Sequence, residues 1–155
     1  MLSRDDIKDE KLRKLYDYWR GKHHGDRLPS RTDIDPVEIP HLLNNIALFR
    51  VVGDGEDFVF DLAGARIEEV HGYSLKGVAL SEQRTSLEDS PAVEQYREVA
   101  REAEPRYREG DLKPFGKEYW ASKRLLLPLS SDGKKVDTVL AGAVFWPARA
   151  ERPDT

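Results

Sequence analysis

The strongest pattern in the chain is a pair of strand-like runs in its first half. Residues 46–52 (IALFRVV) and 58–63 (FVFDLA) are rich in branched and aromatic side chains, and the glycines of residues 53–56 (GDGE) favour a tight hairpin turn between them. Successive side chains of a strand point to opposite faces. On the second run, the face that is predicted to meet the core carries Phe58, Phe60 and Leu62.

A periodic stripe of large apolar side chains predicts a helix over residues 5–21, with Gly21 at its end. The stripe consists of Leu12, Leu15, Tyr16 and Trp19. The pattern permits two interpretations: the stripe packs on its own domain, or it pairs with a second copy of the chain. The spacing does not separate them, so these residues are candidates for a dimer interface.

The rest of the chain predicts further helices and then three strands. Short helical segments are expected within residues 35–45 and 65–70, and a longer helix is expected at residues 90–104, capped by Ser90. Apolar runs separated by turn residues predict a meander of strands at residues 106–112, 118–129 and 136–146. The order of elements predicts an α+β fold: a five-stranded antiparallel sheet with helices on one face, plus the N-terminal amphipathic helix.

Length and composition set the limits of this prediction. The chain has 155 residues, which is enough for one domain that folds without staples. Its predicted parts are an N-terminal helix at 1–22, the main domain at 23–147 and a disordered tail at 148–155.

The charge pattern narrows the classes of partner. Lys and Arg number 25 against 29 Asp and Glu, and no basic block is present, so nucleic-acid binding is not expected. No apolar run approaches the roughly 18 residues that a membrane-spanning helix needs. The first residues lack the apolar core of a signal peptide, so we expect a cytoplasmic protein without a membrane partner.

Motifs of catalysis and metal binding do not occur in the chain. It has no Gly-x-Ser-x-Gly elbow, no His-Glu-x-x-His, no phosphate loop and no dinucleotide fingerprint, so it is predicted not to be an enzyme. The adjacent His23 and His24 fall in a polar loop without a carboxylate at ligand spacing. No metal site is expected.

Several segments resemble PAS domains, whose elements follow the same order. Residues 58–64 (FVFDLAG), a short helix and residues 71–77 (HGYSLKG) resemble the second strand, first helix and following connection of PAS sensors. Residues 15–19 (LYDYW), 29–36 (PSRTDIDP) and 124–129 (RLLLPL) are similar to a bacterial family of stand-alone PAS-like proteins.

The resemblance, which spans residues 12–145, implies a PAS-like fold in which sheet and helices enclose a small-molecule pocket or merely a core. It also implies a leading helix that often dimerises, and it implies no reaction. PAS-like domains usually pass a change at the pocket to the sheet and then to a partner or an output domain.

The cofactors known for this fold depend on particular residues. Flavin photosensors and coumaroyl photoreceptors of this type need a cysteine for their adduct, and the chain has no cysteine. Haem-binding members use a histidine of the long helix, and residues 90–104 contain none, so haem is not expected. His71 either faces a pocket, where an imidazole is a possible ligand, or is a surface or hydrogen-bonding residue, which is the expected case. The sequence therefore indicates no particular cofactor.

Candidate pocket residues come from the hairpin, the helices and the longest strand. Arg124 either points outward to Asp61 or Glu118, which is the expected case, or into the pocket, where a ligand carboxylate would be its partner. A buried charge without a partner costs roughly several kcal/mol, which is why a partner is required. The candidates are Phe58, Phe60, Leu62, Arg66, His71, Tyr73, Tyr96, Arg124 and Leu126.

These expectations favour a sensory or regulatory domain that binds a small molecule between sheet and helices. It would act through a protein partner or as a homodimer. The alternative is a ligand-free dimerisation or interaction module, motivated by the apolar stripe of the first helix. A small α+β enzyme is the third alternative.

Overall fold

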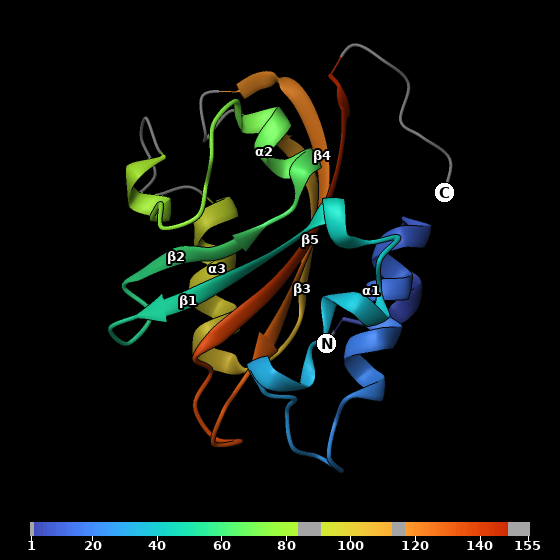
Figure 1. Cartoon of the computed structure of the whole chain (residues 1–155), viewed down its shortest axis with the longest axis vertical. Coiled ribbons are helices and arrows are strands. Elements are labelled where there is room, and N and C mark those ends of the chain that lie inside the picture. Colours follow the sequence, from blue (N-terminus) through green and yellow to red (C-terminus); the bar gives the residue numbers. More distant parts are fainter. Residues whose placement is uncertain (1, 84–90, 113–116, 149–155) are drawn as a thin grey trace.

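The chain folds around a five-stranded antiparallel sheet with the strand order β2-β1-β5-β4-β3 (Figure 1). The structure is a computed structural model that describes residues 2–83, 91–112 and 117–148. The strands are β1 (Ile46–Val52), β2 (Asp57–Ala63), β3 (Arg106–Leu112), β4 (Lys117–Leu129) and β5 (Thr138–Pro147). The helices are α1 (Glu10–Gly21), α2 (Ala65–His71) and α3 (Pro91–Glu102).

Short 3₁₀ turns connect these elements: η1 (Arg4–Asp6), η2 (Arg31–Asp33), η3 (Pro36–Glu38), η4 (Leu43–Asn45) and η5 (Leu80–Glu82). The Asp35 side chain caps η3 by accepting a hydrogen bond from the amide of Val37. The element order confirms the predicted α+β fold. The predicted cap at Ser90, the turn at 113–116 and the tail from 149 onward lie outside the described residues.

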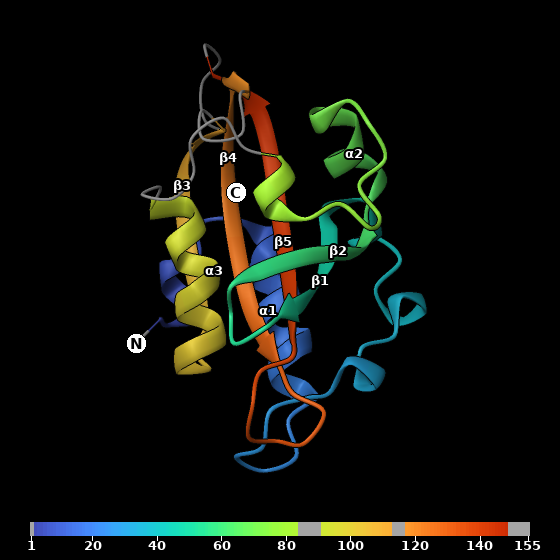
Figure 2. The ribbon, with the colours of Figure 1, turned by 90° about the vertical axis from the view of Figure 1, so that its left-hand side faces the viewer.

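Both faces of the sheet are covered by helices. Figure 2 shows α2 and α3 on the near side of the sheet, here called the front face, and α1 on the far side, the back face. The front core includes Phe49, Phe58, Phe60, Val99 and Val139. The back core includes Leu12, Leu15, Leu48, Leu125 and Leu140. The main sheet therefore separates two apolar layers.

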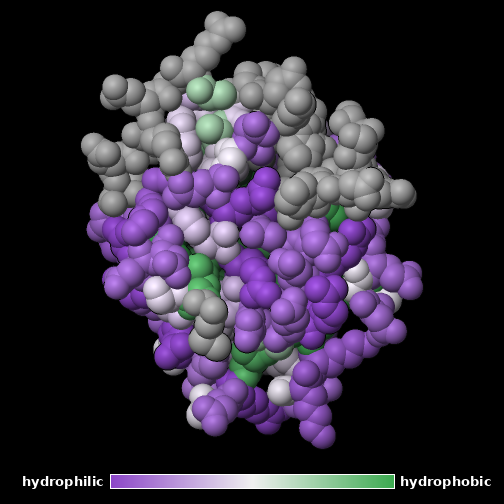
Figure 3. All heavy atoms as spheres, turned by 180° about the vertical axis from the view of Figure 1, so that it is seen from behind, coloured by the Kyte–Doolittle hydropathy of each residue, from purple (hydrophilic) through white to green (hydrophobic). Residues whose placement is uncertain are grey.

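The surface seen from behind is mainly polar, and the hydrophobic patches in its coloured part are small and separate (Figure 3). The exposed large hydrophobic residues of the described chain are far apart in sequence: Val37 in η3, Val52 at the end of β1 and Tyr73 after α2. Within the described ranges, no helix combines the length and the apolar character that crossing a membrane requires.

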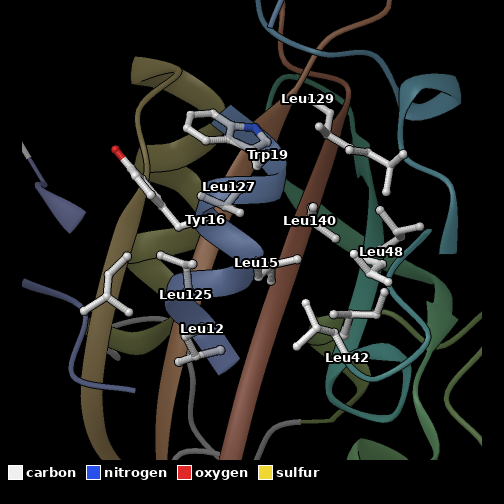
Figure 4. Packing of buried hydrophobic residues seen from close by; sticks show 14 residues of the cluster. Leu12, Leu15, Tyr16, Trp19, Leu42, Leu48, Leu125, Leu127, Leu129 and Leu140 are labelled. Carbon is white, nitrogen blue, oxygen red and sulfur yellow. The ribbon is translucent and has the colours of Figure 1, made fainter. Parts of the chain in front are cut away.

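Helix α1 packs on the back face of its own sheet. Its four stripe residues face leucines of β1, β4 and β5 (Figure 4). Trp19 Nε1 also donates a hydrogen bond of 2.9 Å to the carbonyl of Pro128. The approach requires a glycine at position 142, because a Cβ there would lie 2.5 Å from Leu15 Cδ2. The proposed dimer residues Leu12, Leu15, Tyr16 and Trp19 are all buried within the chain, so in this structure their side chains are not available to a second copy.

The segment 29–36, which carries part of the resemblance, ties this helix to the body of the protein. Ser30 and Asp33 form a capping box around η2. The Tyr18 hydroxyl of α1 accepts from the amide of Asp35 at 2.9 Å and donates to Glu38 Oε1 at 2.7 Å. Ser30, Asp33 and Asp35 of this segment therefore have structural partners.

A β-bulge in β2 changes which side chains reach each core. Leu48 pairs with Leu62 while the next residue of β1, Phe49, pairs with Phe60, so Asp61 is an extra residue in β2. Beyond it the alternation is inverted, and Leu62 packs against the back core. The prediction that Leu62 shares a face with Phe58 and Phe60 is therefore wrong.

The back core predicts a strong effect of truncating α1. Leu15 is 1% exposed, so Leu15→Ala is expected to lower the free energy of unfolding by about 2–5 kcal/mol through lost burial and a residual cavity. Lys14→Ala, one position earlier on the exposed side of the helix, is the matched control and should have little effect. Chemical denaturation measures both. Equal effects of the two variants would contradict the packing of α1 on the sheet.

The turn between β4 and β5 predicts an acid-dependent contribution to stability. Asp132 accepts hydrogen bonds from the amides of Lys135 and Lys134 and from the Ser130 hydroxyl, which hold its pKa at about 2 against an ordinary 3.8. Its stabilisation is therefore fully present above the ordinary pKa and is lost as pH falls through the folded pKa. Denaturation from pH 5 to pH 2 should show a smaller loss in Asp132→Asn than in the parent protein. Identical acid dependence of the parent protein and Asp132→Asn would contradict this role of Asp132.

Candidate functional site

A small cavity lies between the front face of the sheet and the helices. Its volume is about 50 Å³. Strands β1, β2, β4 and β5 supply one wall, and α2, η5 and α3 supply the other. Its apolar lining is Ala47, Phe49, Phe60, Ile67, Leu80, Ala141, Ala143 and Phe145. Its polar lining is His71, Gln83, Tyr96, Ser122 and Arg124.

The cavity exists because alanines occupy the middle of the front face. Ala47 of β1 pairs directly with Ala141 of β5, and Ala143 follows on the same face of β5. Larger side chains surround them, including Phe49 and Phe60, whose ring centroids are 4.2 Å apart. The three methyl groups leave space below the helices that longer side chains would fill.

Arg124 brings a charge into this mainly apolar wall. It is 9% exposed, and Nη2 donates a hydrogen bond of 3.1 Å to Gln95 Oε1 of α3. The guanidinium also lies 4.8 Å from the centroid of the Tyr96 ring, within cation–π distance. Burial lowers the pKa of Arg124, and the nearby charge of Arg108 acts in the same direction, whereas Tyr96 opposes the shift.

A second polar group lies where α2 and η5 meet the cavity. His71 ends α2 and is 8% exposed, and Gln83 follows η5. Gln83 Nε2 lies 3.5 Å from His71 Nδ1 and donates to the Tyr73 hydroxyl at 3.3 Å. The pair gives this side of the cavity amide and imidazole groups, while Tyr73 itself stands at the surface.

The structure brings some of the predicted pocket residues together. Those that line the cavity are Phe60, His71, Tyr96 and Arg124. Phe58 and Leu126 are buried in the front core without lining the cavity. Arg124 points inward, contrary to the outward orientation that was expected, and Asp61 instead lies 3.6 Å from Arg50. The side chain of Glu118 is outside the described set.

Other predicted residues lie elsewhere. Leu62 is on the back face, as the bulge requires. Tyr73 is 46% exposed. Arg66 borders a separate surface hollow between α1, η4 and β5, where it pairs with Glu69 at 2.5 Å and lies 5.1 Å from the Trp120 ring centroid.

Three parts of the lining were not predicted from the sequence. They are Ser122, Gln83 and the alanine floor, which consists of Ala47, Ala141 and Ala143. Ser122 precedes Arg124 by two residues in a strand, so the same alternation that places Arg124 places Ser122 beside it. The small residues of β5 in the run 141–143 (AGA) were also a usable signal of space in the sheet. Gln83 falls in an irregular stretch, where no periodicity indicates its direction.

The comparisons with known proteins agree with this architecture. A family model described as PAS domain matches residues 7–144. The chain belongs to the PAS domain family. PAS domains are typically sensory. No curated protein sequence matches this one.

Solved structures of other PAS-type domains are similar to this PAS domain. A light-oxygen-voltage domain studied with a flavin analogue has a TM-score of 0.52 and 14% identity, covering 72% of this chain and 84% of that chain. A fungal light-oxygen-voltage domain photoreceptor has a TM-score of 0.50 and 15% identity, covering 76% of this chain and 95% of that chain. At these identities the likeness shows the fold alone.

The buried position of Tyr96 predicts that its phenol ionises at a higher pH than an exposed tyrosine. Burial raises the pKa of Tyr96 above its ordinary value of 10.0, since the phenolate would lose its hydration, although the Arg124 charge opposes this. The unfolded chain ionises first, so this tyrosine makes stability fall as pH rises above the ordinary pKa. Tyr96→Phe should remove a phenol from the alkaline end of an ultraviolet titration. Loss of a phenol that titrates at the ordinary value would contradict the burial of the ring.

Proposed function

We propose that this PAS domain is a sensory or regulatory module that binds a small molecule in the cavity of the front face and acts through a protein partner. The observation that carries the proposal is the cavity itself: an alanine floor with a buried arginine in its wall. A site of this kind, apolar with a few converging polar groups, is the usual form of a small-molecule pocket.

The size of the cavity limits the ligand. Its volume is about 50 Å³, whereas an apolar cavity of roughly 150 Å³ holds benzene and pockets for larger ligands have roughly 300–1,000 Å³. A molecule of few heavy atoms therefore suits this conformation. A flavin adduct of the type found in photosensors of this fold is not proposed, because the chain has no cysteine.

Strand β4 offers a route from the cavity to the back of the protein. Ser122 and Arg124 line the cavity, while Leu125 and Leu127 of the same strand pack in the back core with α1. A ligand that shifts β4 would change the packing of this helix, because the two faces share one backbone. We infer that α1, which packs on β4 and β5, carries the change to the partner.

The ligand-free interaction module receives less support from the structure. Its motivation was the apolar stripe of α1, and this stripe is buried against the sheet. Catalysis is not proposed, since the cavity presents one arginine, one histidine and neutral polar groups without an arrangement that points to a reaction.

The proposal predicts a ligand-dependent stabilisation that disappears when the cavity is filled. A metabolite library should contain compounds that raise the melting temperature of the parent protein, by roughly 5–10 °C at a hundredfold excess over Kd. Ala141→Val adds methyl groups to the cavity floor and should abolish the shift. Ala121→Val, in β4 on the opposite face, is the matched control and should retain it.

Differential scanning fluorimetry measures both variants with the same library. The proposal fails if no compound stabilises the parent protein. It also fails if compounds stabilise the parent protein and Ala141→Val equally, since they would then bind elsewhere.

A further inference from the structure

The wall of the cavity at β4 carries positive charge. Arg124 is 9% exposed and lines the cavity, and arginine stays protonated in proteins because its ordinary pKa is so high. Its guanidinium contacts Gln95 Oε1 and the Tyr96 ring. Because Arg124 is buried, an anion that entered the cavity would meet a guanidinium largely shielded from water, where charge-assisted hydrogen bonds are strong.

A second arginine reinforces this charge. Arg108 of β3 pairs directly with Arg124 across the sheet, so the two side chains lie on the same face. Arg106, two positions earlier, is engaged by Glu98 at 3.3 Å and Glu102 at 3.2 Å. Arg108 forms no ion pair with any residue in the described part of the chain. The local field is thus positive along this row of the front face.

The remainder of the cavity suits a short hydrocarbon chain. Ala143 lies directly opposite Arg124 in the β4–β5 register, and Ala141 and Ala47 continue the apolar floor beyond it. Ser122 borders the cavity next to Arg124 on the same strand face and can donate a hydrogen bond from its hydroxyl. A ligand with an acidic end at Arg124 and an alkyl end over the alanines would match both parts.

We propose that the ligand is a short-chain carboxylate of about two or three carbons, whose carboxylate pairs with Arg124 and Ser122 and whose alkyl end lies on the alanine floor. The inference rests on the proposed function, because it names the class of molecule that the same cavity receives. The volume of about 50 Å³ is roughly a third of the space that holds benzene, so it favours the shortest acids, which have fewer heavy atoms than benzene.

Matched ligands test the charge without changing the protein. Sodium acetate, propionate and butyrate are titrated into the protein by isothermal calorimetry, beside acetamide, propionamide and butyramide, with sodium chloride holding the ionic strength constant. Acetate and propionate are expected to bind saturably and butyrate more weakly because of its size. Each amide of the same shape should bind at least about tenfold more weakly than its acid, because it lacks the charge that meets the arginine.

Two arginine variants test the position of the anion. Arg124→Gln is expected to weaken carboxylate binding by about tenfold or more. Arg66→Gln is the matched control and should bind as the parent protein does, since Arg66 lies outside the cavity beside Glu69 and Trp120. If Arg124→Gln does not fold, Arg124→Lys replaces it; retaining the charge without the planar fork should still reduce affinity.

The outcomes separate this inference from the proposed function. The assignment of a carboxylate ligand is overturned if the amides bind as tightly as the carboxylates, or if the folded Arg124 variant binds carboxylates with unchanged affinity. Either result still leaves a cavity that binds small molecules. The same follows if only unrelated library compounds bind and Ala141→Val abolishes their effect. If neither the carboxylates nor any library compound binds, both proposals fail.

Discussion

Both faces of the sheet have to be buried, and most of the structure follows from this constraint. The central strands β4 and β5 carry apolar side chains toward the front and the back alike, as Leu125 and Leu126 show at successive positions. Helices α2 and α3 cover the front only. Helix α1 is therefore required to exclude water from the back, and the glycine at position 142 lets it approach closely. The helix that precedes the main domain in sequence is part of its core.

The sequence was sufficient to predict the helices and strands, but it was not sufficient to predict which way some of their side chains face. Alternation, turn glycines and capping residues predicted the strands and helices in the right order, because these signals are local. The stripe of α1 showed that one side of the helix is buried, but the same stripe would serve a partner chain or its own sheet. Only the tertiary packing of Trp19 and Leu15 on β4 and β5 decides between them.

The candidate site was predictable in part for a similar reason. His71 and Tyr96 were found because their elements face the sheet, and Arg124 was found although its expected direction was wrong. An arginine in an apolar strand usually turns toward water, and this one lies instead over an aromatic ring with an amide at its other side. The hollow itself depends on side chains that are small rather than on side chains that are chemically distinctive, and its full extent becomes visible only once β1 and β5 are aligned.

The extra residue at Asp61 also bears on how relatives of this chain are compared. The pairs on either side of the bulge, Leu48 with Leu62 and Phe49 with Phe60, would be adjacent rungs of a regular ladder if Asp61 were absent. A homologue that lacks this residue keeps every neighbouring side chain on its present face. A gap of one position here in an alignment is therefore compatible with an unchanged core, whereas aligning the two strands without it would assign Leu62 and Ala63 to the wrong layers.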